Sequence, residues 1–236
     1  MIYNKEDKKI SENPENTFQL IYGLENPTEE NIKNEIHSKI SVCDYFYLPI
    51  INKHIPDKSI KTVLEFGSGL GVMANYLSPQ FKKYICIDIN KHYLSECKRY
   101  TQKHNNIEYF LLKDYFFTGV DIKNRSIDII KATNVFIHLH LYEIIIYLNK
   151  FFYLLKEQGL LLFDIFDSDQ LEWNSNIMVE HINNHKRGGN YTFAFKPISS
   201  SEVKKELNKM GLELIYEAKN GQGGCTLGFK KLTKIL

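Results

Sequence analysis

The sequence predicts an α/β fold in which a mostly parallel β-sheet carries helices on both faces. From about residue 60 onward, short apolar runs alternate with longer segments whose apolar residues recur at helical spacing. A strand, a helix and a second strand in this order require right-handed crossovers, and repetition of this unit gives a doubly wound sheet. The chain has 236 residues, of which 43% are hydrophobic and 25% charged, a composition that suits a single domain with a full core.

Residues 1–58 precede the first predicted strand and are expected to form a helical cap region. A helical pattern opens at Thr28, and Ile32, Ile36 and Ile40 supply its apolar face. Such helices either complete the core or cover a ligand, and the sequence leaves both interpretations open.

The next segment, residues 63–77, combines a buried strand, a glycine-rich turn and a helix that starts at about residue 71. Gly67, Gly69 and Gly71 stand at alternate positions in this segment. Because glycine has no Cβ atom, the backbone can turn sharply here and approach a ligand closely. We therefore expect a flat or charged ligand at this turn.

A second predicted strand, residues 84–89, contains Asp88 near its end, and Asp88 follows Gly67 by 21 positions. This is close to the roughly 20 residues expected when an acid at the tip of the second strand reaches a ribose. A nicotinamide dinucleotide site requires G-x-G-x-x-G, but Val72 occupies the place of the third glycine. The spacing therefore weakens the nicotinamide interpretation.

The run from Glu65 to Gly71 resembles the E/D-x-G-x-G-x-G signature of class I S-adenosylmethionine-dependent methyltransferases. The resemblance extends from about residue 60 to the C-terminus and implies a Rossmann-like, mostly parallel seven-stranded sheet with a C-terminal antiparallel hairpin. It also implies that S-adenosylmethionine binds and leaves as S-adenosylhomocysteine. On this resemblance the turn and the second strand contact the cofactor through Glu65, Gly67, Ser68, Gly69, Gly71, Asp88 and Ile89.

A predicted helix over 91–103 leads to a third strand over 107–112, which is followed by Asp114 and Tyr115. In the resembling family an acid at this point accepts a hydrogen bond from the adenine amino group, so both residues are assigned to the cofactor site. The alternative is that Asp114 caps a turn.

Residues 126–139 resemble the family's fourth strand and following turn, F-D-x-V-x-x-x-x-V-x-x-H, with Asp128 and His138 in register. The resemblance implies that Ala132 and Thr133 face the methionine moiety of the cofactor. His138 is either a core histidine or a group that faces the substrate. We predict it as the catalytic base.

A helix over 141–155 and a fifth strand over 159–164 repeat the same unit. Asp164 and Asp167 come at or just beyond the end of this strand. Carboxylates at that place can act as acids and bases, but they are also common turn residues.

Residues 168–198 are less periodic and are predicted to form a substrate lid. His181 and His185 have the spacing of two zinc ligands, but Ile182 replaces the glutamate of H-E-x-x-H, so no metal is predicted. The side chains of this segment that we expect to bind the substrate are His181, Lys186, Arg187 and Tyr191.

The last part of the domain, residues 199–236, follows a cofactor-binding core assigned to 59–167. Ser199 and Glu202 have capping-box spacing, and Gly211 ends the predicted helix. The two strands of the closing hairpin are expected over 212–216 and 226–229.

Charge and cysteine content give no support to several classes of partner. The chain has 30 Lys and Arg residues against 28 Asp and Glu, a net charge of +2 that does not favour nucleic acid or an anionic membrane surface. The N-terminus has no apolar signal core, and no run approaches the ~18 apolar residues of a membrane span, so a cytoplasmic protein is expected. Buried thiols, and not disulfides or zinc ligands, are expected at Cys43, Cys86, Cys97 and Cys225.

These observations together predict methyl transfer from S-adenosylmethionine to a small polar metabolite, as O-methylation of a sugar or a nucleotide-linked sugar. The alternatives are an N-methyltransferase of a small amine, a non-catalytic cofactor-binding subunit and a nicotinamide oxidoreductase. The oligomeric state stays open.

Overall fold

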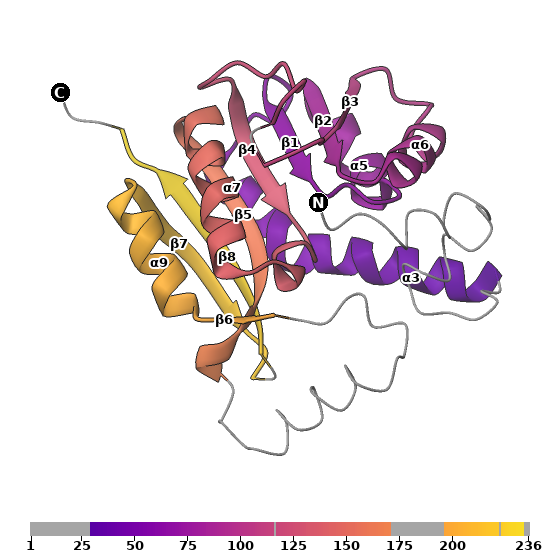
Figure 1. Ribbon diagram of the computed structural model, residues 1–236. Helices are drawn as coiled ribbons and strands as arrows, with labels where there is room; N and C mark the ends of the chain where they lie inside the picture. Colours follow the sequence, from indigo (N-terminus) through magenta and orange to yellow (C-terminus); the bar gives the residue numbers. More distant parts are fainter. Residues whose placement is uncertain (1–28, 116, 171–195, 222, 234–236) are drawn as a thin grey trace.

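One mixed sheet runs through the molecule in the computed structural model, which describes residues 29–115, 117–170, 196–221 and 223–233 (Figure 1). The strand order is β3-β2-β1-β4-β5-β8-β7, and β6 pairs with β5 beside this path. The strands are β1 (Thr62–Phe66), β2 (Lys83–Asp88), β3 (Ile107–Leu111), β4 (Ile127–Ala132), β5 (Leu155–Asp167), β6 (Pro197–Ile198), β7 (Leu212–Lys219) and β8 (Gly224–Lys231).

The strand directions confirm the predicted sheet. Strands β1 to β5 pair in parallel, whereas β8 lies antiparallel between β5 and β7. Two details differ from the expectation. The two-residue strand β6 adds an eighth member, and β5 begins at Leu155 instead of Gly159, because Leu155 already pairs with Ile127 of β4.

Helices precede the sheet and connect its strands. Helix α9 (Ser200–Lys209) begins where the sequence predicts. There the Ser199 hydroxyl oxygen accepts a hydrogen bond from the Glu202 backbone N–H at 3.2 Å. The α-helices are α3 (Glu29–Val42), α4 (Leu48–His54), α5 (Val72–Leu77), α6 (Lys91–Tyr100), α7 (Leu141–Leu154) and α9 (Ser200–Lys209). A π-helix, η2 (Cys43–Tyr47), joins α3 to α4, and 3-10 turns occur at η3 (Ser78–Gln80), η4 (Phe136–His138) and η5 (Ser168–Gln170).

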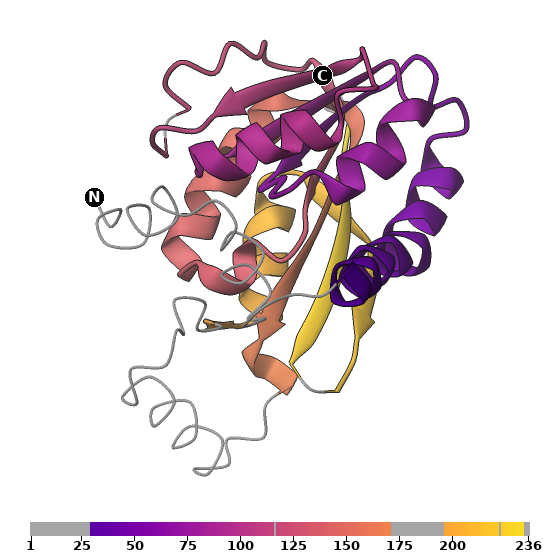
Figure 2. The same ribbon diagram turned by 90° about the vertical axis from the view of Figure 1, so that its right-hand side faces the viewer.

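Helices lie on both faces of the sheet (Figure 2). Each face has its own apolar core, as a doubly wound fold requires. Helices α7 and α9 pack on one face, where Phe66, Phe136 and Phe151 form an aromatic cluster. Elements η2, α4, α5 and α6 pack on the other face. Ligands of such sheets bind at the carboxyl ends of the strands, so the candidate site is expected at that edge.

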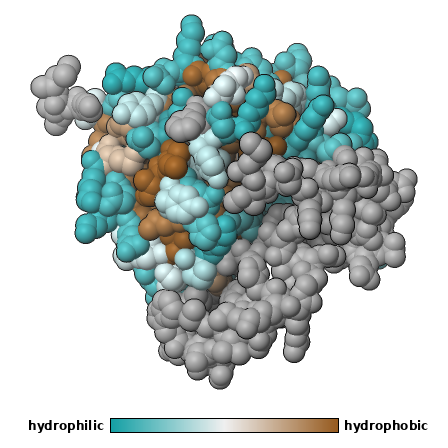
Figure 3. Space-filling view, in the orientation of Figure 1, coloured by the Kyte–Doolittle hydropathy of each residue, from teal (hydrophilic) through white to brown (hydrophobic). Residues whose placement is uncertain are grey.

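The face shown in Figure 3 is mostly hydrophilic, with hydrophobic side chains gathered over α7. On this helix Tyr142, Ile146 and Tyr153 are exposed. None of the helices that the structure describes combines the length and the apolarity needed to cross a membrane.

Candidate active site

The three glycines of the β1–α5 turn all have positive φ angles, 73° at Gly67, 51° at Gly69 and 80° at Gly71. A Cβ atom at Gly67 would overlap Val135, and one at Gly71 would lie 2.6 Å from the Cys97 sulfur. A Cβ atom at Gly69 would meet no atom of the described residues within 4 Å. The turn therefore needs Gly67 and Gly71 for internal packing, whereas Gly69 borders open space that a ligand can fill.

The carboxylate of Asp88 lies directly against this turn. Its Oδ2 accepts a hydrogen bond from the Gly69 N–H at 2.8 Å, and its Oδ1 accepts one from the Asn90 N–H at 2.8 Å. Burial raises the pKa of Asp88 to about 6, so the group is ionised at neutral pH. Beside it, the apolar Ile89 side chain is 48% exposed, and it borders the same edge.

Two further residues of the predicted cofactor site are buried. The hydroxyl oxygen of Ser68 has no hydrogen-bond partner among the residues that the structure describes. The Glu65 carboxylate accepts hydrogen bonds from the Lys131 ammonium at 2.5 Å and from the Tyr84 hydroxyl at 2.9 Å. Both Glu65 oxygens are thus bonded within the sheet, and direct contact of this side chain with the cofactor stays a prediction.

The residues after β3 join the site to helix α7. Asp114 accepts a hydrogen bond from the Thr118 N–H at 3.1 Å, which is the turn cap considered as an alternative. The Tyr115 hydroxyl donates to Glu143 Oε1 at 2.7 Å, and the ring is 39% exposed. An adenine contact of Asp114 and Tyr115 stays a prediction.

The β4 strand ends beside the glycine turn, because Ala132 pairs with Phe66 at the end of β1. The next turn contains Thr133 and then Asn134, whose φ angle is 55°. Asp164 holds this turn, since its two oxygens accept hydrogen bonds from the Asn134 N–H at 2.8 and 3.0 Å. Asp164 therefore has the turn-forming role that the sequence allowed, and burial raises its pKa to about 6.

Tyr47 of the π-helix reaches the same edge, and the sequence analysis did not select it. Its hydroxyl donates to Asp164 Oδ2 at 3.5 Å, and its ring lies 5.8 Å from the Lys131 ammonium. Only the packing of η2 on the sheet brings Tyr47 to Asp164, so no local sequence signal could have identified this contact.

His138 ends the short helix η4 and is partly buried. Burial, with a smaller effect of the positive charge of Lys196, lowers the pKa of His138 to about 4. The imidazole is therefore neutral at pH 7 and can accept a proton only weakly. Its role as a base stays a prediction.

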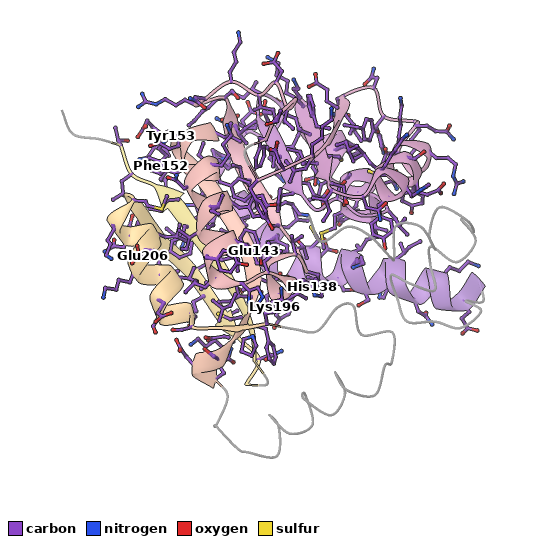
Figure 4. All side chains as sticks on the ribbon, in the orientation of Figure 1. His138, Glu143, Phe152, Tyr153, Lys196 and Glu206 are labelled. Carbon is purple, nitrogen blue, oxygen red and sulfur yellow. The ribbon has the colours of Figure 1, made fainter. Side chains whose placement is uncertain are left out.

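Two polar residues near His138 were not selected from the sequence, namely Glu143 and Lys196 (Figure 4). Glu143 could have been found, because it stands three residues after His140 at the start of α7, in capping-box spacing. No comparable signal marks Lys196. The predicted substrate residues His181, Lys186, Arg187 and Tyr191 lie outside the described residues.

The site lies where the strand order reverses, since β1 is flanked by β2 on one side and β4 on the other. The site suits a nucleoside with free ribose hydroxyls. It offers open space at the Gly69 backbone, a carboxylate at Asp88 and an exposed apolar side chain at Ile89. Among the described residues, no three His, Cys, Asp or Glu side chains gather in a way that could hold a metal ion.

The sequence comparison assigns the class of protein. A family model for a methyltransferase domain matches residues 42–217, which is most of the chain. The chain therefore belongs to this methyltransferase family. It is a class I S-adenosylmethionine-dependent methyltransferase, as the glycine signature predicted. No curated protein matches the sequence.

Solved structures with a similar fold are distant in sequence. The magnesium protoporphyrin IX methyltransferase of Synechocystis PCC 6803 with bound SAH is 13% identical over 95% of this chain and 97% of that chain, with a TM-score of 0.65. A Methanosarcina mazei methyltransferase is 15% identical over 80% and 100%, with a TM-score of 0.63. An N-methyltransferase of Bradyrhizobium japonicum is 12% identical over 85% and 98%, with a TM-score of 0.57. These likenesses show the shared fold.

Proposed function

We propose that this methyltransferase transfers a methyl group from S-adenosylmethionine to a hydroxyl group of a small polar metabolite, such as a sugar or a nucleotide-linked sugar. The observation that carries the proposal is the open space at Gly69 beside the Asp88 carboxylate. The net charge of +2 supports a small acceptor, because it provides little attraction for a polyanion. In this proposal the enzyme works in the cytoplasm, residues 1–58 cap the site and residues 168–198 form a lid.

The residues at the turn fit the cofactor. A ribose offers two hydroxyl donors, and each oxygen of the Asp88 carboxylate has a lone pair beyond the one that the Gly69 or Asn90 N–H uses. The exposed Ile89 provides an apolar surface for a base. When bound, S-adenosylmethionine supplies a methyl group that its sulfonium already activates. The protein then contributes mainly alignment of the acceptor and exclusion of water.

The chain's own contribution to proton transfer is assigned to His138. Its neutral imidazole can accept the proton that the acceptor hydroxyl releases as the new oxygen–carbon bond forms. A carboxylate acceptor, which is already deprotonated at pH 7, would depend less on this residue.

Calorimetry with S-adenosylhomocysteine tests the cofactor site. We expect the wild-type protein to bind it and Asp88→Ala to bind about tenfold or more weakly, because hydrogen bonds to a charged group contribute about 1.5–3 kcal/mol. Asp57→Ala is the control, since this acid caps the Ser59 turn away from the site. Equal binding by Asp88→Ala and Asp57→Ala would remove Asp88 from the cofactor site.

A screen with radiolabelled cofactor tests the acceptor. Faster transfer to tRNA, rRNA or protein lysine than to any small hydroxylated compound would refute the proposal. Transfer to a small amine would identify an N-methyltransferase, and cofactor binding without transfer to any acceptor would indicate a non-catalytic subunit.

A further inference from the structure

The backbone of Lys196 is held beside the turn that carries His138. Its N–H donates a hydrogen bond to the Ile137 carbonyl oxygen in η4 at 2.8 Å. The residues that follow form β6, in which Pro197 pairs with Phe166 of β5. The backbone of Lys196 is therefore fixed between the β5 edge of the sheet and the turn that carries His138.

The ammonium of Lys196 lacks a close ion-pair partner. Its distance to Glu143 Oε2 is 3.9 Å, which is beyond hydrogen-bonding distance. Glu143 already accepts hydrogen bonds from the Tyr115 hydroxyl and the His140 N–H, each at 2.7 Å. Within the described part of the chain, no acceptor lies at hydrogen-bonding distance from this ammonium, and its side chain is 35% exposed. The ammonium is therefore only weakly paired with Glu143 and is partly accessible to an anion.

His138 and Lys196 lie close together, as Figure 4 shows, and the charge of Lys196 affects the imidazole. The turn that carries His138 begins at Val135, which packs against Gly67 of the cofactor turn. A cation and a neutral imidazole thus meet beside the cofactor site. This pair is suited to a ligand that combines an anionic group with a hydroxyl group.

We propose that Lys196 is a substrate-binding residue that binds an anionic group, a phosphate or a carboxylate, of the methyl acceptor. The acceptor's reacting group then lies on the side of His138. This inference rests on the proposed function, and it narrows the acceptor to acidic metabolites, among which phosphate-bearing sugars fit the proposed chemistry.

Proton NMR of the His138 ring tests the proposal. The full chain is saturated with S-adenosylhomocysteine, and inorganic phosphate, acetate and uncharged glycerol are added as probes. We expect phosphate or acetate to shift the His138 resonances saturably, and glycerol to leave them unchanged. Lys196→Met should weaken binding of the anion by about tenfold or more, whereas Lys196→Arg should retain the wild-type affinity. Lys196→Met should also raise the pKa of His138, because a neighbouring cation is removed.

Lys204→Met is the matched control, because the Lys204 ammonium on α9 lies 3.0 Å from Glu217 of β7 and its side chain is also part-exposed. It should bind the anion as the wild type does. Equal anion binding by Lys196→Met and Lys204→Met, or no saturable shift with either anion, would overturn the inference. If S-adenosylhomocysteine fails to bind but the anion response still depends on Lys196, the proposed function fails and the anion site stands.

Discussion

At the scale of the residue, the three glycines of one motif have different physical roles. Gly67 and Gly71 leave room for Val135 and Cys97, whereas Gly69 leaves room for a ligand. A motif match alone treats the three as equivalent, because it records identity and spacing but not what each missing Cβ would meet. Replacement of each glycine is therefore expected to have a different consequence.

We expect Gly69→Val to abolish binding of S-adenosylhomocysteine while the fold is retained, since the valine side chain would occupy the open space at the turn. Gly211→Val is a matched control, because Gly211 also has a positive φ angle, of 90°, and open surroundings. Both variants should lose thermal stability from backbone strain, because a β-branched residue is disfavoured at a positive φ angle. Normal cofactor binding by Gly69→Val would show that this glycine serves the turn alone.

For His138→Ala we expect turnover to fall by about 10²–10⁴ with little change in cofactor affinity, if the imidazole is the base. Because the pKa of His138 is about 4, any change in wild-type turnover between about pH 6 and pH 8 must come from another group. Steady-state kinetics and calorimetry on the variant check both points. Retained activity with reduced thermal stability would instead identify a core histidine.

At the scale of the element, a buried ion pair joins the central strands. Glu65 of β1 and Lys131 of β4 stand opposite each other in the sheet register, and both side chains are buried. Tyr84 of β2 donates to the same carboxylate, so three strands share one polar cluster. Loss of one member leaves an uncompensated charge in an apolar core.

We expect Lys131→Ala to lower the free energy of unfolding by about 3–5 kcal/mol in urea titrations. Combining Lys131→Met with Glu65→Leu and Tyr84→Phe should recover most of this loss, because no buried polar group is then left without a partner. Lys209→Ala, which removes an exposed pair with Glu206, should change stability by less than about 1 kcal/mol. A similar loss in both single variants would contradict the importance of burial.

At the scale of the whole molecule, the buried carboxylate of Asp88 makes stability depend on pH. The pKa of Asp88 is raised by burial from 3.8 to about 6 in the folded protein. The folded state therefore binds more protons than the unfolded state between these values. The contribution of this group to stability is fully present below pH 3.8 and is lost as the pH rises to about 6.

We expect the free energy of unfolding of Asp88→Asn, relative to wild type, to increase by about 2 kcal/mol between about pH 4 and pH 7, measured without ligand. The pH-dependent contributions of other groups cancel in this difference, and so does the pH-independent cost of the substitution. A difference that stays constant with pH would show that the carboxyl group titrates normally in the fold.

Periodicity and spacing were sufficient for the doubly wound sheet and the glycine turn, and the resemblance to class I methyltransferases added the C-terminal antiparallel pair and the cofactor class. These features depend on residues close together in the chain, since the alternation of strands and helices fixes which strand edge carries the turn. The β4 turn and the cap of α9 were located for the same reason.

Other features required the tertiary structure. Glu65 meets Lys131, 66 positions away, only through the register of β1 on β4. Tyr47 reaches Asp164 only because the π-helix packs on the sheet, and Lys196 reaches His138 only because its backbone binds the η4 turn. Sequence periodicity places a side chain on a face of its own element. The packing of the elements decides which distant side chains lie next to one another. It thereby decides whether a side chain is charged, neutral or available to a ligand.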